Sequence, residues 1–190
     1  DQLSALAEIL SRRSGDQLVY KNLAVEVGVD EKTVKKWVKA LKSLYFGFEI
    51  RPWFKNVENS IRKTPKWFMR DWSQVTDEGK RVETFVACHL LKAVEGWTDL
   101  GYGDFSLNYL RNKQKREVDF LVVRDGKPWF LVEAKKHDEA LSPNLALYQR
   151  QTGARHAFQV VFDAPYVNRS CFDAEAPTVV PARTFLSQLL

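Results

Sequence analysis

The sequence predicts an α/β protein in which a mostly helical N-terminal part precedes a mixed central sheet flanked by helices. Apolar residues recur at helical spacing over residues 3–44, and two strand-like runs follow at 46–54 and 66–72. From residue 79 onward, helical segments alternate with short apolar strands. We therefore expect two domains, at residues 1–72 and 73–190.

The first domain is expected to contain three helices. They are predicted at 3–13, 20–27 and 30–44, with a tight turn at Gly28-Val29 and Asp30 as the N-cap of the third. A helix, a turn with glycine and a second helix form the helix-turn-helix pattern. Together with the two following strands and the polar stretch that joins them, this pattern predicts a winged helix.

The third predicted helix has an apolar stripe on one side and lysines on the other. Residues 1–72 hold 14 Lys and Arg against 9 Asp and Glu, whereas residues 73–190 hold 15 of each. This excess favours DNA as a partner, although a solvated helix face is the alternative. The candidate DNA-binding residues are Lys32, Lys35, Lys36, Lys39 and Lys42.

The second domain is expected to open with a helix at 79–95. Strands are then predicted at 106–111, 117–124, 128–135 and 156–162, a helix from Ser142-Pro143, and a C-terminal helix at 182–190. Cys88 and Cys171 lack a C-x-x-C spacing, so neither a disulfide framework nor a thiolate zinc site is expected.

No run of the sequence approaches the eighteen apolar residues of a membrane helix, and the first residues do not resemble a signal peptide. We therefore expect a cytoplasmic protein without membrane contact. The chain begins at Asp1 and not at Met, which suggests a piece of a longer protein with a further domain.

Acidic residues interrupt two strands that otherwise have the composition of interior strands. Asp119 lies in EVDFLVV, and Glu133 and Lys135 lie two residues apart in WFLVEAK, so the latter two project from one face. A two-residue loop at Asp125-Gly126 would send Asp119 and Glu133 to opposite faces. A three-residue loop of residues 124–126 would bring them together, and we predict this loop because only it makes a site.

Two carboxylates in a cleft repel unless a cation lies between them, and oxygen ligands favour Mg²⁺ or Mn²⁺. The metal would polarise a phosphoryl oxygen and lower the pKa of a bound water. Lys135 can orient that water or neutralise charge in the transition state. The residue types therefore predict phosphodiester hydrolysis, with Asp119, Glu133 and Lys135 as the catalytic residues.

These residues resemble the PD-(D/E)XK nuclease superfamily, through Glu117-Val118-Asp119 and Glu133-Ala134-Lys135. The resemblance implies that Glu83, in the helix at 79–95, completes the metal ligands. It also implies that a Gln or Tyr on the helix after Ser142 supports the site, and the candidates are Tyr148, Gln149 and Gln151.

The sequence resembles still more closely an uncharacterised family, the C-terminal part of prokaryotic AAA-type ATPases. LAVEVGVDEKTVKKWVKAL, TPKWFMRDW, GKRVETFVACHLL, EVDFLVV and LVEAKK carry this resemblance, which covers residues 5–163. Pro65, Lys66 and Asp71 match the family pattern, while Ser73 replaces its usual glycine. The resemblance implies an ATPase domain N-terminal to this chain, since no G-x-x-x-x-G-K-[ST] loop occurs here.

The leading hypothesis is thus a Mg²⁺- or Mn²⁺-dependent nuclease that acts on DNA. The alternative is a non-cleaving nucleic-acid- or protein-binding module that regulates the attached ATPase, because the same scaffold can bind without cutting. A third possibility is a transcription regulator, whose DNA binding would survive mutation of Glu133.

Overall fold

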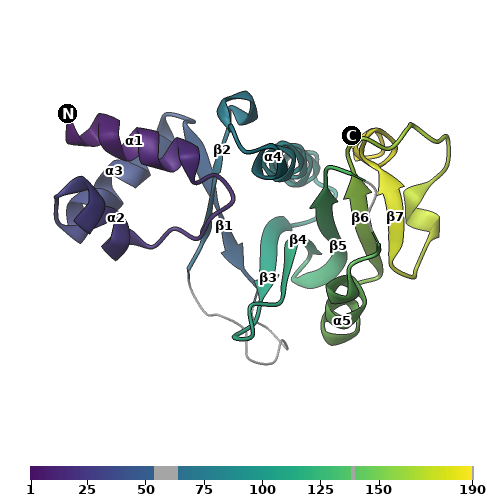
Figure 1. Ribbon diagram of the computed structural model, residues 1–190. Coiled ribbons are helices and arrows are strands. Elements are labelled where there is room, and N and C mark those ends of the chain that lie inside the picture. The colour runs from purple at the N-terminus through teal and green to yellow at the C-terminus, as the bar shows by residue number, and fades with distance from the viewer. Residues whose placement is uncertain (54–63, 138–139, 190) are drawn as a thin grey trace.

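The computed structural model describes residues 1–53, 64–137 and 140–189 (Figure 1). Its α-helices are α1 (Gln2–Arg12), α2 (Tyr20–Val27), α3 (Glu31–Ser43), α4 (Glu78–Asp99), α5 (Pro143–Thr152) and α6 (Ala182–Leu186). Its strands are β1 (Gly47–Pro52), β2 (Lys66–Met69), β3 (Phe105–Arg111), β4 (Glu117–Arg124), β5 (Lys127–Lys135), β6 (His156–Val161) and β7 (Thr178–Pro181). Most of the polar stretch expected between β1 and β2 lies outside the described residues.

These strands form one seven-stranded mixed sheet in the order β2-β1-β3-β4-β5-β6-β7. The pairs β1–β2, β3–β4 and β4–β5 are antiparallel, whereas β1–β3, β5–β6 and β6–β7 are parallel. Because β1 pairs with β3 through Arg51 and Pro52, the sheet continues across the boundary expected at residue 72.

Helices cover both faces of the sheet, since alternate residues of the interior strands are buried on opposite sides. Phe130 and Val132 of β5 pack in the large core with α4 and α6, whereas Leu131 packs in a smaller core with Leu145 and Tyr148 of α5. Figure 1 shows α4 and α5 on opposite sides of the sheet. Because both faces of the sheet are covered, the residues of β4 and β5 that face either side are mostly apolar.

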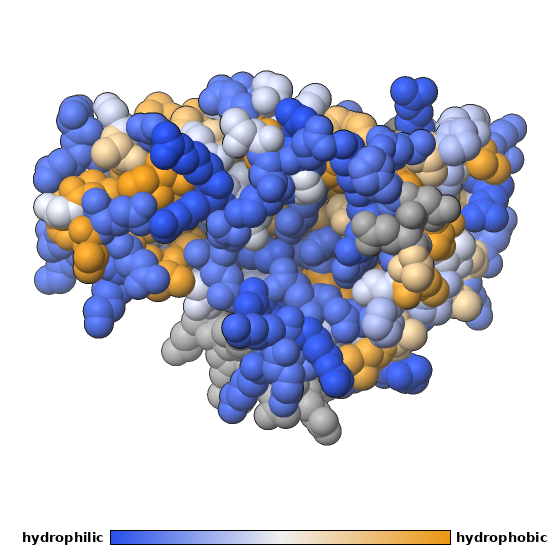
Figure 2. Space-filling view, in the orientation of Figure 1, coloured by the Kyte–Doolittle hydropathy of each residue, from blue (hydrophilic) through white to orange (hydrophobic). Residues whose placement is uncertain are grey.

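The three N-terminal helices form a third core against β2. Leu6, Leu23 and Val38 are buried there with Trp67 and Met69 of β2. Asp30 caps α3 as expected, since its Oδ1 accepts a hydrogen bond from the Thr33 amide at 3.0 Å. In Figure 2, hydrophilic residues predominate on the face shown, with smaller hydrophobic areas over these helices.

The structure confirms the helices and strands predicted from periodicity, with boundaries shifted by a few residues. It adds β7, a four-residue strand ending in Pro181, which is too short to show a period. Cys88 and Cys171 are both free thiols, as expected. No helix in the described ranges has the length and apolar character needed to cross a bilayer.

The turn between β4 and β5 differs from our prediction. Arg124 pairs with Lys127, so the loop contains only Asp125 and Gly126, and the three-residue loop was wrong. Both loop residues have positive φ, 50° and 72°, which is the pattern of a type I′ turn. This turn suits the strand twist better than the loop that we predicted.

A β-bulge at Trp129 compensates for the shorter loop. Val123 pairs with Pro128, but Val122 pairs with Phe130, so Trp129 is an extra residue in β5. Beyond the bulge, the register is shifted by one residue. The bulge, and not the loop, therefore decides which residues of β4 and β5 lie opposite one another.

We predict that Gly126→Val destabilises the protein by about 1–2 kcal/mol, because a β-branched residue is strained at positive φ. Gly126→Asn, the matched control, should cost less than about 1 kcal/mol, since Asn tolerates this conformation. Chemical denaturation of both variants measures the difference. Equal costs would contradict the role assigned to the left-handed turn.

Candidate functional site

Asp119 and Glu133 come together on the paired strands β4 and β5. Phe120 pairs with Val132, and continuing this register by one residue sets Asp119 opposite Glu133. Residues directly opposite in an antiparallel pair lie on the same side of the sheet. Asp119 Oδ2 also accepts a hydrogen bond from the amide of Ala134, at 2.9 Å. The two acids therefore meet as expected, through the bulge and not through a longer loop.

A buried lysine from β2 binds two further carboxylates. Lys66 is 4% exposed, and its Nζ lies 2.8 Å from Glu83 Oε1 and in contact with Glu117 Oε1. Glu117 Oε2 accepts a hydrogen bond from Arg111 Nη1 at 2.9 Å. We call Lys66, Glu83, Glu117 and Arg111 the Lys66 network. It joins strands β2, β3 and β4 to helix α4 through charge.

The segment after α1 packs against the Lys66 network. Gln17 forms a β-bridge with Lys66, which aligns the start of β2. A Cβ added to Gly15, whose φ is 86°, would lie 3.0 Å from Glu83 Oε2. Ser14 Oγ and Thr84 Oγ1 form a buried hydrogen bond of 2.8 Å. We call Asp119, Glu133, Glu83 and Glu117 the acidic cluster. The segment that follows α1 thus contacts the acidic cluster directly, through Glu83.

Glu133 retains one carboxylate oxygen without a partner. Its side chain is buried, with Oε1 3.5 Å from Lys135 Nζ, while Oε2 has no hydrogen-bond partner among the described residues. Leaving a buried polar atom unpaired costs about 1–3 kcal/mol, so such atoms are rare without a functional reason. This oxygen is the clearest indication that the cluster binds a ligand.

Burial raises the pKa values of all three predicted acids. The pKa of Glu133 rises to about 8, first through burial and then through the negative charge of Asp119. Burial also raises the pKa of Asp119, and it raises that of Glu83 to about 7 although Lys66 opposes the shift. The cluster therefore tends to hold protons near neutral pH, and a bound cation would release them.

The pKa of Lys66 is shifted in the direction that keeps its ammonium group charged. Burial alone would lower the pKa of its ammonium group, but the carboxylates of Glu83, Asp119 and Glu117 outweigh burial and raise this pKa. A permanently charged ammonium group thus lies inside the acidic cluster.

Asp119 and Glu133 fit a hard divalent cation, because both offer carboxylate oxygens and Glu133 Oε2 is unpaired. Glu83, the third expected ligand, instead binds Lys66. Across residues 1–53, 64–137 and 140–189, no three His, Cys, Asp or Glu side chains form a ready metal site. The arrangement fits a metal held by two carboxylates, with water completing its shell, as Mg²⁺ commonly allows.

Two of the three candidate supporting residues on α5, Tyr148 and Gln149, form hydrogen bonds away from Asp119 and Glu133. The Tyr148 hydroxyl donates to the Arg116 carbonyl at 2.8 Å, just before β4. Gln149 Nε2 donates to the Glu175 carbonyl at 2.6 Å, toward the connection between β6 and β7. Successive helix residues point about 100° apart, so only Tyr148 faces the sheet. In this structure the Gln149 side chain is thus directed away from Asp119 and Glu133.

Gln159 of β6 is the glutamine that neighbours the acids. It pairs with Glu133 in the sheet and is fully buried. Its Oε1 accepts a hydrogen bond from the Ser142 amide at 2.8 Å, which fixes the start of α5. The indication in the sequence was a polar residue in the apolar run HAFQVVF.

The lysines of α3 lie at a distance from the acids. Figure 1 places α3 at one end of the molecule, with β4 and β5 nearer the centre. Lys35 forms an ion pair with Glu31, and Lys42 forms one with Glu49. The other three lysines predicted to bind DNA have no ion pair among the described residues, namely Lys32, Lys36 and Lys39.

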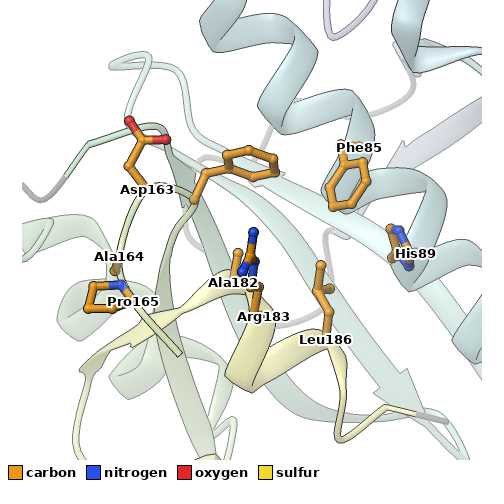
Figure 3. Close-up of a pocket in the computed structure, with 9 residues that line it drawn as sticks. Phe85, His89, Asp163, Ala164, Pro165, Ala182, Arg183 and Leu186 are labelled. Carbon is orange, nitrogen blue, oxygen red and sulfur yellow. The ribbon is translucent and has the colours of Figure 1, made fainter. Parts of the chain in front are cut away.

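A cavity of about 700 Å³ is lined by residues of α4 and α6 and of the segment after β6 (Figure 3). Phe85 and His89 of α4 line one side of it, and Arg183 and Leu186 of α6 line another. Phe162, directly after β6, contacts Phe85 with ring centres 5.5 Å apart. None of the acids discussed above lines this cavity, so its size does not make it the reaction site.

We predict that Lys66→Met destabilises the protein by about 3–5 kcal/mol at pH 8, because it leaves the partly buried Glu83 and Glu117 without their cation. Lys80→Met is the matched control, since Lys80 pairs with Asp16 at a partly exposed position and should cost under about 1 kcal/mol. Urea denaturation measures both values. Equal losses would contradict the structural role of the Lys66 network.

The raised pKa of Glu133 predicts a pH dependence of stability in metal-free protein. Between its ordinary pKa of 4.5 and its folded value of about 8, the folded state holds a proton that the unfolded chain releases. The free energy of unfolding should therefore fall as the pH rises from about 5 to about 8.

Glu133→Gln cannot ionise and should lose less stability over this range. The gap between the variant and the parent protein should widen by about 1–3 kcal/mol from pH 5 to pH 8. Denaturation in a chelator at several pH values measures it, with the exposed Glu175→Gln as control. Parallel pH profiles for all three proteins would show that Glu133 ionises normally.

Two family models match the chain. One, described as a domain of unknown function (DUF8612), matches residues 1–76, and the other, also a domain of unknown function (DUF4143), matches residues 78–163. No curated protein and no solved structure matches the chain. Each family match covers less than half of the 190 residues. The chain is therefore similar to two domains of unknown function that adjoin at the start of α4.

Proposed function

We propose that this protein is a Mg²⁺- or Mn²⁺-dependent nuclease that hydrolyses DNA phosphodiesters. In this proposal, residues 1–72 form a winged helix and residues 73–190 form a PD-(D/E)XK-like domain. The observation that carries the proposal is the unpaired oxygen Oε2 of Glu133, which is buried beside Asp119. The other oxygen of the same carboxylate, Oε1, contacts Lys135.

The chain's own groups have distinct roles in this chemistry. Asp119 and Glu133 would hold the cation, which supplies Lewis acidity and a lowered pKa for bound water. Lys135, two residues from Glu133 on β5, would orient the attacking water or neutralise charge on the phosphoryl oxygens. Lys66 neutralises Glu83 and Glu117, which leaves Asp119 and Glu133 as the cation-binding pair.

A second candidate function is a non-cleaving module that regulates an attached ATPase. The observation that favours it is the ammonium group of Lys66, which already supplies a positive charge inside the acidic cluster. If this charge suffices to stabilise the acids, the cluster can be structural. The two candidates differ in one measurable property, because only the nuclease requires a divalent metal for its activity.

We predict that the protein cleaves DNA with Mg²⁺ or Mn²⁺ and is inactive in a chelator. Glu133→Ala and Lys135→Ala should each lower the rate by at least about 100-fold, because they remove a metal ligand and a charge-stabilising group. Linear, nicked and single-stranded DNA serve as substrates in a gel assay.

Glu175→Ala is the matched control, since Glu175 is an exposed glutamate outside the cluster, and it should retain full activity. Folding of every variant is checked by circular dichroism. If the folded protein binds metal but cuts none of the substrates, the nuclease proposal fails and the regulatory module is favoured. Cleavage that survives Glu133→Ala would place the chemistry elsewhere.

A further inference from the structure

A strongly basic hairpin connects β3 and β4 beside the acidic cluster. It has the sequence RNKQKR at residues 111–116. We infer that this hairpin, and not α3, is the main docking site for the phosphate backbone of DNA. The inference rests on the proposed function and names where its substrate is held.

The charges at the tip of the hairpin are available to a partner. Lys113, Lys115 and Arg116 are exposed, and none has an ion pair within the described part of the chain. Arg111, at the base, is instead bound to Glu117. In Figure 2, hydrophilic residues dominate the lower projection of the molecule, where Figure 1 places the end of the β3–β4 hairpin. Three clustered cations that have no counter-charge among the described residues complement a polyanion.

Hydrogen bonds at the base of the hairpin fix its backbone. Asn112 is 7% exposed, and its Oδ1 accepts a hydrogen bond from the Arg116 amide at 3.0 Å. The Asn112 amide donates to the Arg116 carbonyl at 3.1 Å, and the Tyr148 hydroxyl donates to the same carbonyl at 2.8 Å. Because the backbone is fixed, binding a ligand would cost little ordering of the loop. Through its hydrogen bond to the Arg116 carbonyl, Tyr148 helps to position the hairpin.

Lys115 has a backbone conformation that favours a different residue type. Its φ is 63°, in the left-handed region, where glycine or asparagine is more favourable than lysine. A three-residue loop ending in a left-handed residue is a common hairpin, usually with glycine at this position. A lysine at this position adds charge at a conformational cost, as functional positions often do.

The hairpin leads directly into the acidic residues. Arg116 immediately precedes β4, and Asp119 lies three residues further along this strand. At roughly 3.3 Å per residue this separation is about 10 Å, which corresponds to about three base-pair rises along the axis of a DNA duplex. A backbone bound at the tip can therefore extend across Asp119 and Glu133. The lysines of α3 lack this continuity with the acids.

The test compares two charge reversals of equal size. One variant carries Lys113→Glu, Lys115→Glu and Arg116→Glu, and the matched control carries Lys32→Glu, Lys36→Glu and Lys39→Glu. Binding of a fluorescent 20-base-pair DNA duplex is measured by anisotropy in a chelator, over a series of salt concentrations. The hairpin variant should bind at least about 10-fold more weakly, with a salt slope smaller by about three, whereas the α3 variant should change little.

Lys115→Gly separates charge from folding. It removes one cation and relieves the left-handed lysine, so the unfolding midpoint should stay constant or rise while DNA binding weakens. Unchanged binding by Lys115→Gly, or a loss in the α3 variant that equals or exceeds that of the hairpin variant, would overturn the inference. Absence of DNA binding by the parent protein would also overturn it.

The outcomes for the proposed nuclease are distinct. Glu133→Gln should bind the duplex as the parent does while failing to cut it. A parent protein that binds through the hairpin but cuts no DNA refutes the nuclease and leaves the docking site in place.

Discussion

The charge of Lys66 inside the acidic cluster is the interaction on which the rest of the site depends. Two partly buried glutamates, Glu83 and Glu117, share one ammonium group, and each comes from a different element of the α/β part. Removing two charges from water is costly unless they are paired closely. Since Lys66 begins β2 and is bridged by Gln17, the pairing also ties the N-terminal helices to the cluster. The position of one lysine thus couples the two parts of the chain.

Backbone geometry then decides which acids remain for a ligand. The type I′ turn at Asp125-Gly126 alone would set Asp119 opposite Val132, and the bulge at Trp129 moves Asp119 opposite Glu133. A single extra residue therefore creates the carboxylate pair. Bulges are often found beside active sites, where they redirect side chains in this way. The unpaired oxygen of Glu133 follows from this geometry, since Lys66 is bound to other acids.

The distribution of charge along the chain concealed the basic surface nearest the acids. Residues 73–190 have no net charge, so their sum hides the cations at residues 111–116. In three dimensions these cations gather on one hairpin, while Glu117 at its base is neutralised by Arg111 and Lys66. The connection at the end of strands β3 and β4 is therefore positive, while the carboxylates beside it are negative. Such a division suits a polyanionic ligand that needs a cation at one point of its backbone.

The sequence by itself determined the order of the helices and strands, because apolar periodicity and caps such as Asp30 are local. It also predicted Asp119, Glu133 and Lys135 as candidate site residues, since charged residues are unusual in apolar strands. The tertiary structure alone decided the single sheet, the bulge, and the pairing of Lys66 with Glu83, because these depend on contacts between residues distant in sequence. For the same reason only the fold could direct Gln149 away from the acids and set Gln159 beside Glu133. Local patterns fix what each segment forms, and packing fixes which side chains meet.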